Sequence, residues 1–199
     1  MLTQNRPLRS RSRLYDSDSA YGWISILLHW GTAAVVILLW LIGQSILHQP
    51  ADAVDLRRAL HVSIAASAWL IILFRIIWRL RSRHPHVRGL STSVHRIATS
   101  AHYLMLFFLL LMLLSGPLLV WSQGQPIRIF DWYAINGPIR ESESLANAAL
   151  FIHSNSAMLL FWLVMLHIGG ALKHLMFHTD DTFARMIWPD HRDNTQAGE

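Results

Sequence analysis

Residues 148–177 read AALFIHSNSAMLLFWLVMLHIGGALKHLMF, a run in which Lys173 is the only charged side chain. As an α-helix, at about 1.5 Å per residue, the run is long enough to cross the roughly 30 Å of hydrocarbon in a bilayer. It contains His153 and His167, and an imidazole inside a membrane is costly unless it has a partner. Their spacing corresponds to a rise of about 21 Å and a rotation about 40° short of four full turns. One helix face therefore presents two imidazoles at two depths.

Three further apolar runs are also long enough to span a bilayer. The chain of 199 residues is 53% hydrophobic and 15% charged, with a mean hydropathy of +0.32, which is typical of integral membrane proteins. We therefore expect an all-α, integral membrane four-helix bundle within residues 21–188, between a basic N-terminal tail (1–20) and a polar C-terminal tail (189–199). The run nearest the N-terminus, Trp23–Leu47, is too long and too rich in tryptophan for a cleaved signal peptide. The three runs are Trp23–Leu47, Ala59–Leu80 and Ala98–Trp121.

The sequence contains no cysteine. This excludes disulfides, thiolate metal sites, iron–sulfur clusters and the attachment motif of c-type haem. Phosphate-binding glycine loops, HExxH helices and nucleophile elbows are absent as well, so hydrolytic and nucleotide chemistry have no visible basis. Any redox cofactor must be held by nitrogen, oxygen or methionine ligands.

The distribution of arginine predicts the orientation of the four spans. Arginines are concentrated before the first span, between the second and third spans, and after the fourth, which places these segments in the cytoplasm and gives an N-in, C-in topology. The connections at 48–58 and 122–147 are mixed in charge and are expected to be periplasmic. The basic pI of about 10.4 then reflects orientation and lipid headgroups rather than nucleic acid.

Depth sorts the histidines of the spans into two pairs. His61 and His153 lie near the periplasmic ends of their spans, whereas His29 and His167 lie near the cytoplasmic ends. Two neutral imidazoles facing one another across a bundle could bind a haem iron from both axial positions and leave it suited to one-electron transfer. Small residues nearby would leave room for a planar macrocycle, namely Gly31, Ser63, Ala65, Gly169 and Gly170.

Other interpretations of these histidines stay open at this point. A single buried histidine is more often a hydrogen-bonded structural group than a ligand. On the periplasmic side only His48 competes with the pair. On the cytoplasmic side His95, His102 and His174 occupy similar depths, and spacing alone does not exclude His102 as a ligand.

Several segments, in this order and spacing, resemble the bacterial cytochrome b561 family. The resemblance covers about residues 21–188. It implies a multi-pass protein of the bacterial inner membrane that holds two haem b groups between His29 and His167 and between His61 and His153. The segments are ILLHW (26–30), RRALHVS (57–63), AHYL (101–104), SGP (115–117), the run from His153 through His167 to Lys173 and His174, and DTFARM (181–186).

Within the family the resemblance is greatest to superoxide oxidases that pass electrons to ubiquinone, and it places a quinone site near His174. The chain would then be an oxidoreductase, most simply a superoxide:ubiquinone oxidoreductase. One alternative is a non-enzymatic electron-transfer subunit for a partner such as a hydrogenase or a periplasmic reductase. An alternative of another class is a histidine-lined transporter for protons or a divalent metal.

Two further features bear on the site. Arg75 follows His61 by 14 residues, so it shares that helix face at the depth of the cytoplasmic pair, where a guanidinium could bind a haem propionate. The 122–147 connection carries two arginines against three carboxylates. Its net charge of about minus one departs from the positive funnel that would steer superoxide.

Pro117 interrupts the third run. A proline inside a helix lacks the N–H that would bond to the carbonyl four residues earlier, which here belongs to Leu113. We expect a kink, with this carbonyl satisfied by a neighbouring group.

Overall fold

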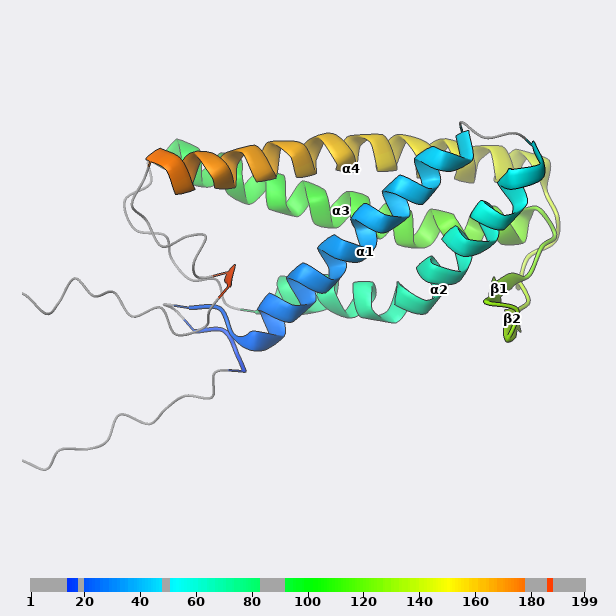
Figure 1. Cartoon of the computed structure of the whole chain (residues 1–199), viewed down its shortest axis with the longest axis horizontal. Helices are drawn as coiled ribbons and strands as arrows, with labels where there is room; N and C mark the ends of the chain where they lie inside the picture. Colours follow the sequence, from blue (N-terminus) through cyan, green and yellow to red (C-terminus); the bar gives the residue numbers. More distant parts are fainter. Residues whose placement is uncertain (1–13, 18–19, 48–50, 83–91, 178–185, 188–199) are drawn as a thin grey trace, which may run out of the picture.

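The computed structural model describes residues 14–17, 20–47, 51–82, 92–177 and 186–187. It consists of four long helices and one short hairpin (Figure 1). All four helices are long and apolar enough to cross a membrane, which confirms the predicted all-α class and the number of spans. The elements are α1 (Trp23–Leu47), α2 (Ala51–Arg81), α3 (Thr92–Ser122), β1 (Ile127–Ile129), β2 (Tyr133–Ile135) and α4 (Glu143–Phe177).

The helices run alternately up and down and form two closely packed pairs, α1 with α2 and α3 with α4. We call the end where α1 begins and α4 ends the terminal end, and the end that carries β1 and β2 the hairpin end (Figure 1). Between the pairs, α2 packs on α3 through a small buried core. Helices α1 and α4 meet through side chains, as in the stack of Trp40 on Phe161 with ring centroids 4.6 Å apart. The buried core consists of Ala68, Ile72, Ile76 and Leu113.

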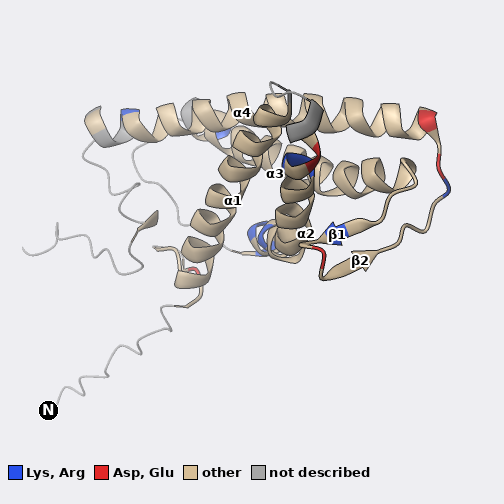
Figure 2. Ribbon diagram, turned by 45° about the vertical axis from the view of Figure 1, so that its right-hand side comes forward, with Lys and Arg blue, Asp and Glu red and all other residues tan. Residues whose placement is uncertain are grey.

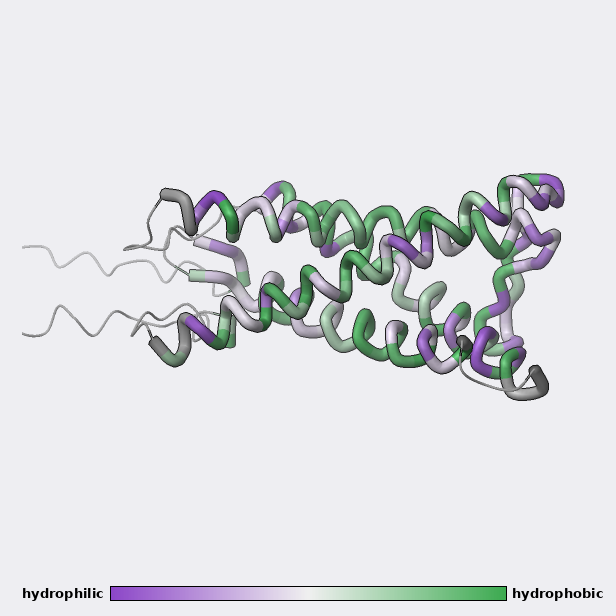
Figure 3. Tube along the Cα trace, turned by 90° about the horizontal axis from the view of Figure 1, so that it is seen from above, coloured by the Kyte–Doolittle hydropathy of each residue, from purple (hydrophilic) through white to green (hydrophobic). Residues whose placement is uncertain are grey.

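The surface of the bundle is apolar along its middle and polar toward its ends. Charged residues gather near the two ends (Figure 2), and the hydropathy of the trace is highest between them (Figure 3). Large aliphatic and aromatic side chains point outward from every helix, such as Leu70 at 71% exposure and Phe151 at 69%. In water this surface would be costly, whereas in lipid it is the expected one.

Three helices begin earlier than the apolar runs that predicted them. Helix α2 begins at Ala51, α3 at Thr92 and α4 at Glu143, each within a polar sequence. The prediction of a loop over 48–58 was therefore wrong from residue 51 onward, and residues 48–50 lie outside the described part. Backbone hydrogen bonding continues a helix beyond the hydrocarbon layer, so hydropathy marks the span and not the end of the helix.

The carbonyl freed by Pro117 has a partner from another helix. Trp69 on α2 donates its indole Nε1–H to the main-chain oxygen of Leu113 over 3.0 Å. The prediction that a neighbour satisfies this carbonyl is confirmed, and the donor is a residue that the sequence did not single out.

The β1–β2 hairpin turns through two residues with positive φ, Phe130 at 47° and Asp131 at 58°. The turn closes with a hydrogen bond from the Trp132 N–H to the Ile129 carbonyl. Ser63 on α2 holds the hairpin, because its Oγ accepts the Phe130 N–H over 3.0 Å and donates to the Arg128 carbonyl over 3.2 Å. The hairpin is thereby fixed two residues from His61 on the same helix.

Part of the predicted N-terminal tail is attached to the terminal end of the bundle. The Asp16 carboxylate accepts the Gly22 N–H and the Ser25 hydroxyl, and Trp78 on α2 donates its indole N–H to Ser25. The ring of Tyr15 stacks on Trp78. Asp16 thus satisfies a free main-chain donor just before α1.

Candidate functional site

Two of the predicted histidines face each other near the hairpin end. His61 on α2 and His153 on α4 have ring centroids 6.3 Å apart and planes inclined at 76°. Both side chains are partly buried inside the bundle. The structure therefore brings together the pair that the sequence assigned to the periplasmic side.

His153 is held by α3. The Ser115 hydroxyl donates to the Leu111 carbonyl over 2.6 Å, and its oxygen lies 3.1 Å from Nδ1 of His153. The ring packs against α3 at Gly116, where an added Cβ would lie 3.5 Å from Cε1 of His153, an ordinary van der Waals contact. The imidazole is thus fixed by one polar contact and one close packing contact.

His61 rests on α1 in a similar way but without a side-chain partner. A Cβ at Gly43 would lie 3.6 Å from Cε1 of His61, so the ring packs against the helix backbone there. The Leu39 main-chain oxygen is a backbone acceptor near this ring. Among the described residues no group makes a hydrogen bond of standard geometry with the buried Nδ1 of His61.

The second histidine pair lies toward the terminal end. His29 on α1 and His167 on α4 have ring centroids 6.3 Å apart, with planes inclined at 67°. His102 on α3 also approaches His167, with centroids 5.1 Å apart. The terminal end therefore has three imidazoles from three helices, and His167 is the member that contacts both others.

The centroid separations can be compared with what a shared metal ion requires. A metal–nitrogen bond of about 2.0–2.1 Å, with about 1.1 Å from each nitrogen to its ring centre, places two opposed imidazole centroids about 6.4 Å apart. The His61–His153 and His29–His167 separations of 6.3 Å fit this value, and the His102–His167 separation is too short for it. In the described part of the chain, no group of three or more histidine, aspartate or glutamate side chains has metal-binding geometry. The His61–His153 and His29–His167 pairs thus have the spacing of two opposed imidazoles on one metal ion.

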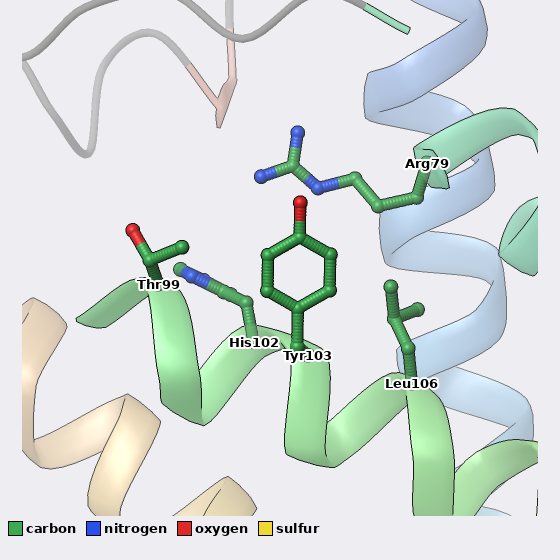
Figure 4. Close-up of a pocket in the computed structure, with 5 residues that line it drawn as sticks. All are labelled: Arg79, Thr99, His102, Tyr103 and Leu106. Atoms are coloured by element: carbon green, nitrogen blue, oxygen red, sulfur yellow. The ribbon is translucent and has the colours of Figure 1, made fainter. Parts of the chain in front are cut away.

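A pocket opens beside His102, one of the three imidazoles (Figure 4). Arg79 reaches over it from α2, so that its guanidinium lies above the Tyr103 hydroxyl, while His102 and Thr99 line its other side. Arg79 also lies over the ring of Tyr21, 5.8 Å from the ring centroid. Hydroxyl, guanidinium and imidazole groups here meet the apolar side chain of Leu106.

The structure describes some of the other predicted site residues and leaves some outside its described part. Arg75 is partly buried on α2 and lies within electrostatic range of both His29 and Asp16, so the structure brings it to the terminal-end pair. His95 is exposed at the start of α3. His174 falls in the last turns of α4, but its side chain is outside the described part, as is all of His48.

Sequence reasoning missed Ser115, Arg79 and Tyr103 as site residues. Ser115 was quoted only as part of a motif, and its signal was a buried hydroxyl next to Gly116 in an apolar run. Arg79 lies in the last turn of α2, where an arginine ordinarily extends toward the membrane surface. Tyr103 follows His102 directly, and only the tertiary structure brings the two residues to one pocket with Arg79.

Comparisons with known proteins agree with this arrangement. The model of the prokaryotic cytochrome b561 family matches residues 20–189. The chain is similar to cytochrome b561 homolog 2 of Escherichia coli (strain K12), with 28% identity over 182 residues that cover 86% of this chain and 93% of the relative. Because the family match spans nearly the whole chain, four spans and both histidine pairs included, the protein belongs to the prokaryotic cytochrome b561 family of haem-dependent membrane electron carriers.

Proposed function

We propose that this protein is a superoxide:ubiquinone oxidoreductase with two haem b groups, each bound by two histidines. The observation that carries the proposal is the repeated 6.3 Å separation of the His61–His153 and His29–His167 rings, which fits two opposed imidazoles on one iron. Held by two histidines in each pair, haem would supply one-electron transfer.

The glycines near the rings support room for a large planar ligand. His61 and His153 pack beside Gly43 and Gly116, where an added Cβ would be in van der Waals contact with the imidazole. At the terminal end, a Cβ added at Gly31 or Gly169 would meet nothing within 4 Å. Glycine at these places lets a macrocycle lie close to the helix backbone, as small residues do at other contacts inside membranes.

His29 is the better partner for His167 than His102 is. The 5.1 Å between the centroids of His102 and His167 leaves too little room for an iron between their nitrogens, whereas 6.3 Å to His29 suffices. We assign His102 to the neighbouring pocket, where it lies beside Tyr103.

The reaction joins a one-electron donor to a two-electron acceptor. Two superoxide anions each give up one electron at the hairpin end and leave as O₂. Ubiquinone at the terminal end takes up the two electrons and two protons and becomes ubiquinol. The two histidine pairs, about 21 Å apart along α4, divide the path across the bilayer into shorter steps. The N-in, C-in orientation predicted by the arginines places superoxide in the periplasm and proton uptake in the cytoplasm.

The pocket at the terminal end is where we expect the quinone headgroup. Tyr103, His102 and Arg79 offer hydrogen-bond donors for quinone carbonyls, and Leu106 offers an apolar wall. Arg75, close to His29, is suited to a haem propionate. His174 is a further candidate for the quinone site, from its position in the last turns of α4.

Absorption spectra and stopped-flow kinetics of the purified protein test this function. We expect dithionite to produce the bands of reduced b-type haem, and superoxide to reduce the haem rapidly, with reoxidation when a ubiquinone analogue is added. A protein without haem bands would instead be the histidine-lined transporter considered above. Haem that dithionite reduces but superoxide does not would contradict the superoxide assignment alone.

The variants His61→Ala and His29→Ala locate the entry of electrons. We expect each variant to retain one haem. Superoxide should still reduce the haem that remains in His29→Ala rapidly, and it should reduce the haem of His61→Ala slowly, because electrons enter at the hairpin end. Equal rates in the two variants would contradict this direction of transfer.

A second candidate function is electron transfer to or from a partner protein. The observation that favours it is the hairpin, which presents Trp132 at 90% exposure with Tyr133 and Phe130 beside it. Exposed aromatic residues are enriched in protein interfaces. Reduction of the haem by dithionite but not by superoxide, together with loss of partner-dependent turnover in Trp132→Ala, would favour this candidate.

A further inference from the structure

We infer that Ser115 is a positioning residue for the hairpin-end haem, which selects the tautomer of His153 and lowers the reduction potential of that haem. The inference rests on the proposed ligation of haem by His153 and extends it to a residue outside the ligand set. Three observations carry it, and they concern the Ser115 hydroxyl proton, the packing of the His153 ring, and the contrast with His61.

The Ser115 hydroxyl has one proton, and that proton is already used. Its Oγ lies 2.6 Å from the Leu111 carbonyl, which can only accept a hydrogen bond. The contact of 3.1 Å to His153 therefore needs Nδ1 to be the donor and Oγ the acceptor. A neutral imidazole with its proton on Nδ1 keeps the lone pair of Nε2 free to bind a metal. Ser115 thus selects the tautomer that a ligand needs.

The ring is also fixed in place, so this contact persists. Ser115 is only 3% exposed, and the His153 ring packs against α3 beside the adjacent Gly116. A buried acceptor with no route to water holds its donor more strongly than an exposed one would. The hydrogen bond therefore sets the direction of the imidazole as well as its protonation.

The two ligands of the hairpin-end site differ in this respect. His153 has the Ser115 hydroxyl at Nδ1, whereas His61 has no side-chain partner at Nδ1 among the described residues and only the Leu39 main-chain oxygen as an acceptor near its ring. When Nδ1–H of a ligand imidazole donates a hydrogen bond, its Nε2 becomes a more basic ligand. A more basic ligand stabilises ferric haem and lowers its reduction potential. His153 is therefore the ligand through which a single hydroxyl can adjust the hairpin-end haem.

The experiment is a redox titration of the haem-loaded protein and three variants, read from the absorption bands. In Ser115→Ala we expect the potential of one haem to rise. At a fixed ambient potential, the ratio of reduced to oxidised haem should increase at least threefold. This corresponds to a rise in the reduction potential of about 28 mV, at 59 mV per tenfold change for one electron. The other haem should keep its potential. Ser115→Thr retains a hydroxyl on Cβ and should restore the value of the unmodified protein.

Ser154→Ala is the matched control. The Ser154 hydroxyl also bonds to the carbonyl four residues earlier and adjoins His153 in sequence, but it is exposed, and among the described residues it makes no hydrogen bond to a histidine. Unchanged potentials in Ser115→Ala, or equal shifts in Ser154→Ala, would overturn the inference. If Ser115→Ala loses one haem, retention of both haems in Ser115→Thr supports the inference about Ser115. Loss of a haem in both variants overturns that inference. Failure of the unmodified protein to bind two haems would instead contradict the proposed function.

Discussion

The ring of His102 contacts the ring of His167 edge-on, with centroids 5.1 Å apart and planes inclined at 70°. This contact occurs at the same end of the bundle as the His29–His167 pair, whose centroids are 6.3 Å apart. The shorter distance suits a packing contact between two neutral rings, and the longer one suits two ligands of one iron. His102 thus lies next to the proposed ligand His167 but too close to it for an iron to fit between the two rings.

The first prediction separates these roles by haem content. We expect His29→Ala to retain one haem for each protein chain, because the terminal-end site loses a ligand. We expect His102→Ala to retain two, because both proposed ligands remain. Haem quantified against protein concentration after purification measures the ratio. One haem in His102→Ala together with two in His29→Ala would reverse the assignment.

The second prediction concerns the electronic structure of the oxidised haems. The ring planes are inclined at 76° in the His61–His153 pair and at 67° in the His29–His167 pair. Nearly perpendicular imidazole planes leave two iron d orbitals close in energy, which gives a strongly anisotropic low-spin signal. Electron paramagnetic resonance of the ferric protein should show two such signals. A rhombic signal typical of parallel ligand planes would contradict these ring orientations.

The fold and the histidine pairs could be predicted because both follow from regular geometry. Hydropathy over some twenty residues reveals a span, since the hydrocarbon layer has a fixed thickness. The 14-residue spacing of His153 and His167 fixes their shared face, since a helix has a fixed rotation per residue. The structure brings each of them to the partner that depth predicted, His61 and His29.

The contacts that tune the site could not be predicted, because they depend on how the helices rotate against one another. Ser115 and Trp69 lie in apolar runs on different helices, and nothing in their local sequence indicates that one meets His153 and the other Leu113. The pocket at Arg79 and Tyr103 likewise needs the packing of α2 on α3. Helix ends were predicted less well than helix centres, because polar residues continue the helices past the membrane.

The third prediction concerns the indole of Trp69. Trp69→Phe keeps most of the ring but leaves the Leu113 carbonyl without its donor, at a cost of about 1–3 kcal/mol in the free energy of unfolding. In the Pro117→Ala background the main-chain N–H at position 117 can donate to that carbonyl instead. The same Trp69→Phe change should then cost less, with a coupling of about 0.5–1.5 kcal/mol.

Unfolding in mixed micelles, followed by the haem absorption band, measures the stability of four proteins: the unmodified protein, Trp69→Phe, Pro117→Ala and the double variant. Trp40→Phe serves as the control. Trp40 stacks on Phe161 of α4, whereas the hydrogen bond to the Leu113 carbonyl comes from Trp69. Its cost should be the same with and without Pro117→Ala. Additive costs for Trp69→Phe and Pro117→Ala would show that the indole does not replace the missing backbone donor.

The fourth prediction concerns the attachment of the hairpin to α2. Ser63 accepts the Phe130 N–H and donates to the Arg128 carbonyl, so Ser63→Ala removes both hydrogen bonds without altering a proposed haem ligand. Each hydrogen bond contributes about 0.5–1.5 kcal/mol net, so the loss of both should make amide hydrogen exchange across residues 127–135 roughly 5- to 160-fold faster. Ser67→Ala is the control, because the Ser67 hydroxyl bonds to the main-chain oxygen of Ser63 and does not contact the hairpin. Equal exchange in the two variants would contradict the attachment. Because Ser63 follows His61 by two residues on a continuous helix, faster exchange with an unchanged haem spectrum would show that the hairpin moves independently of the ligand beside it.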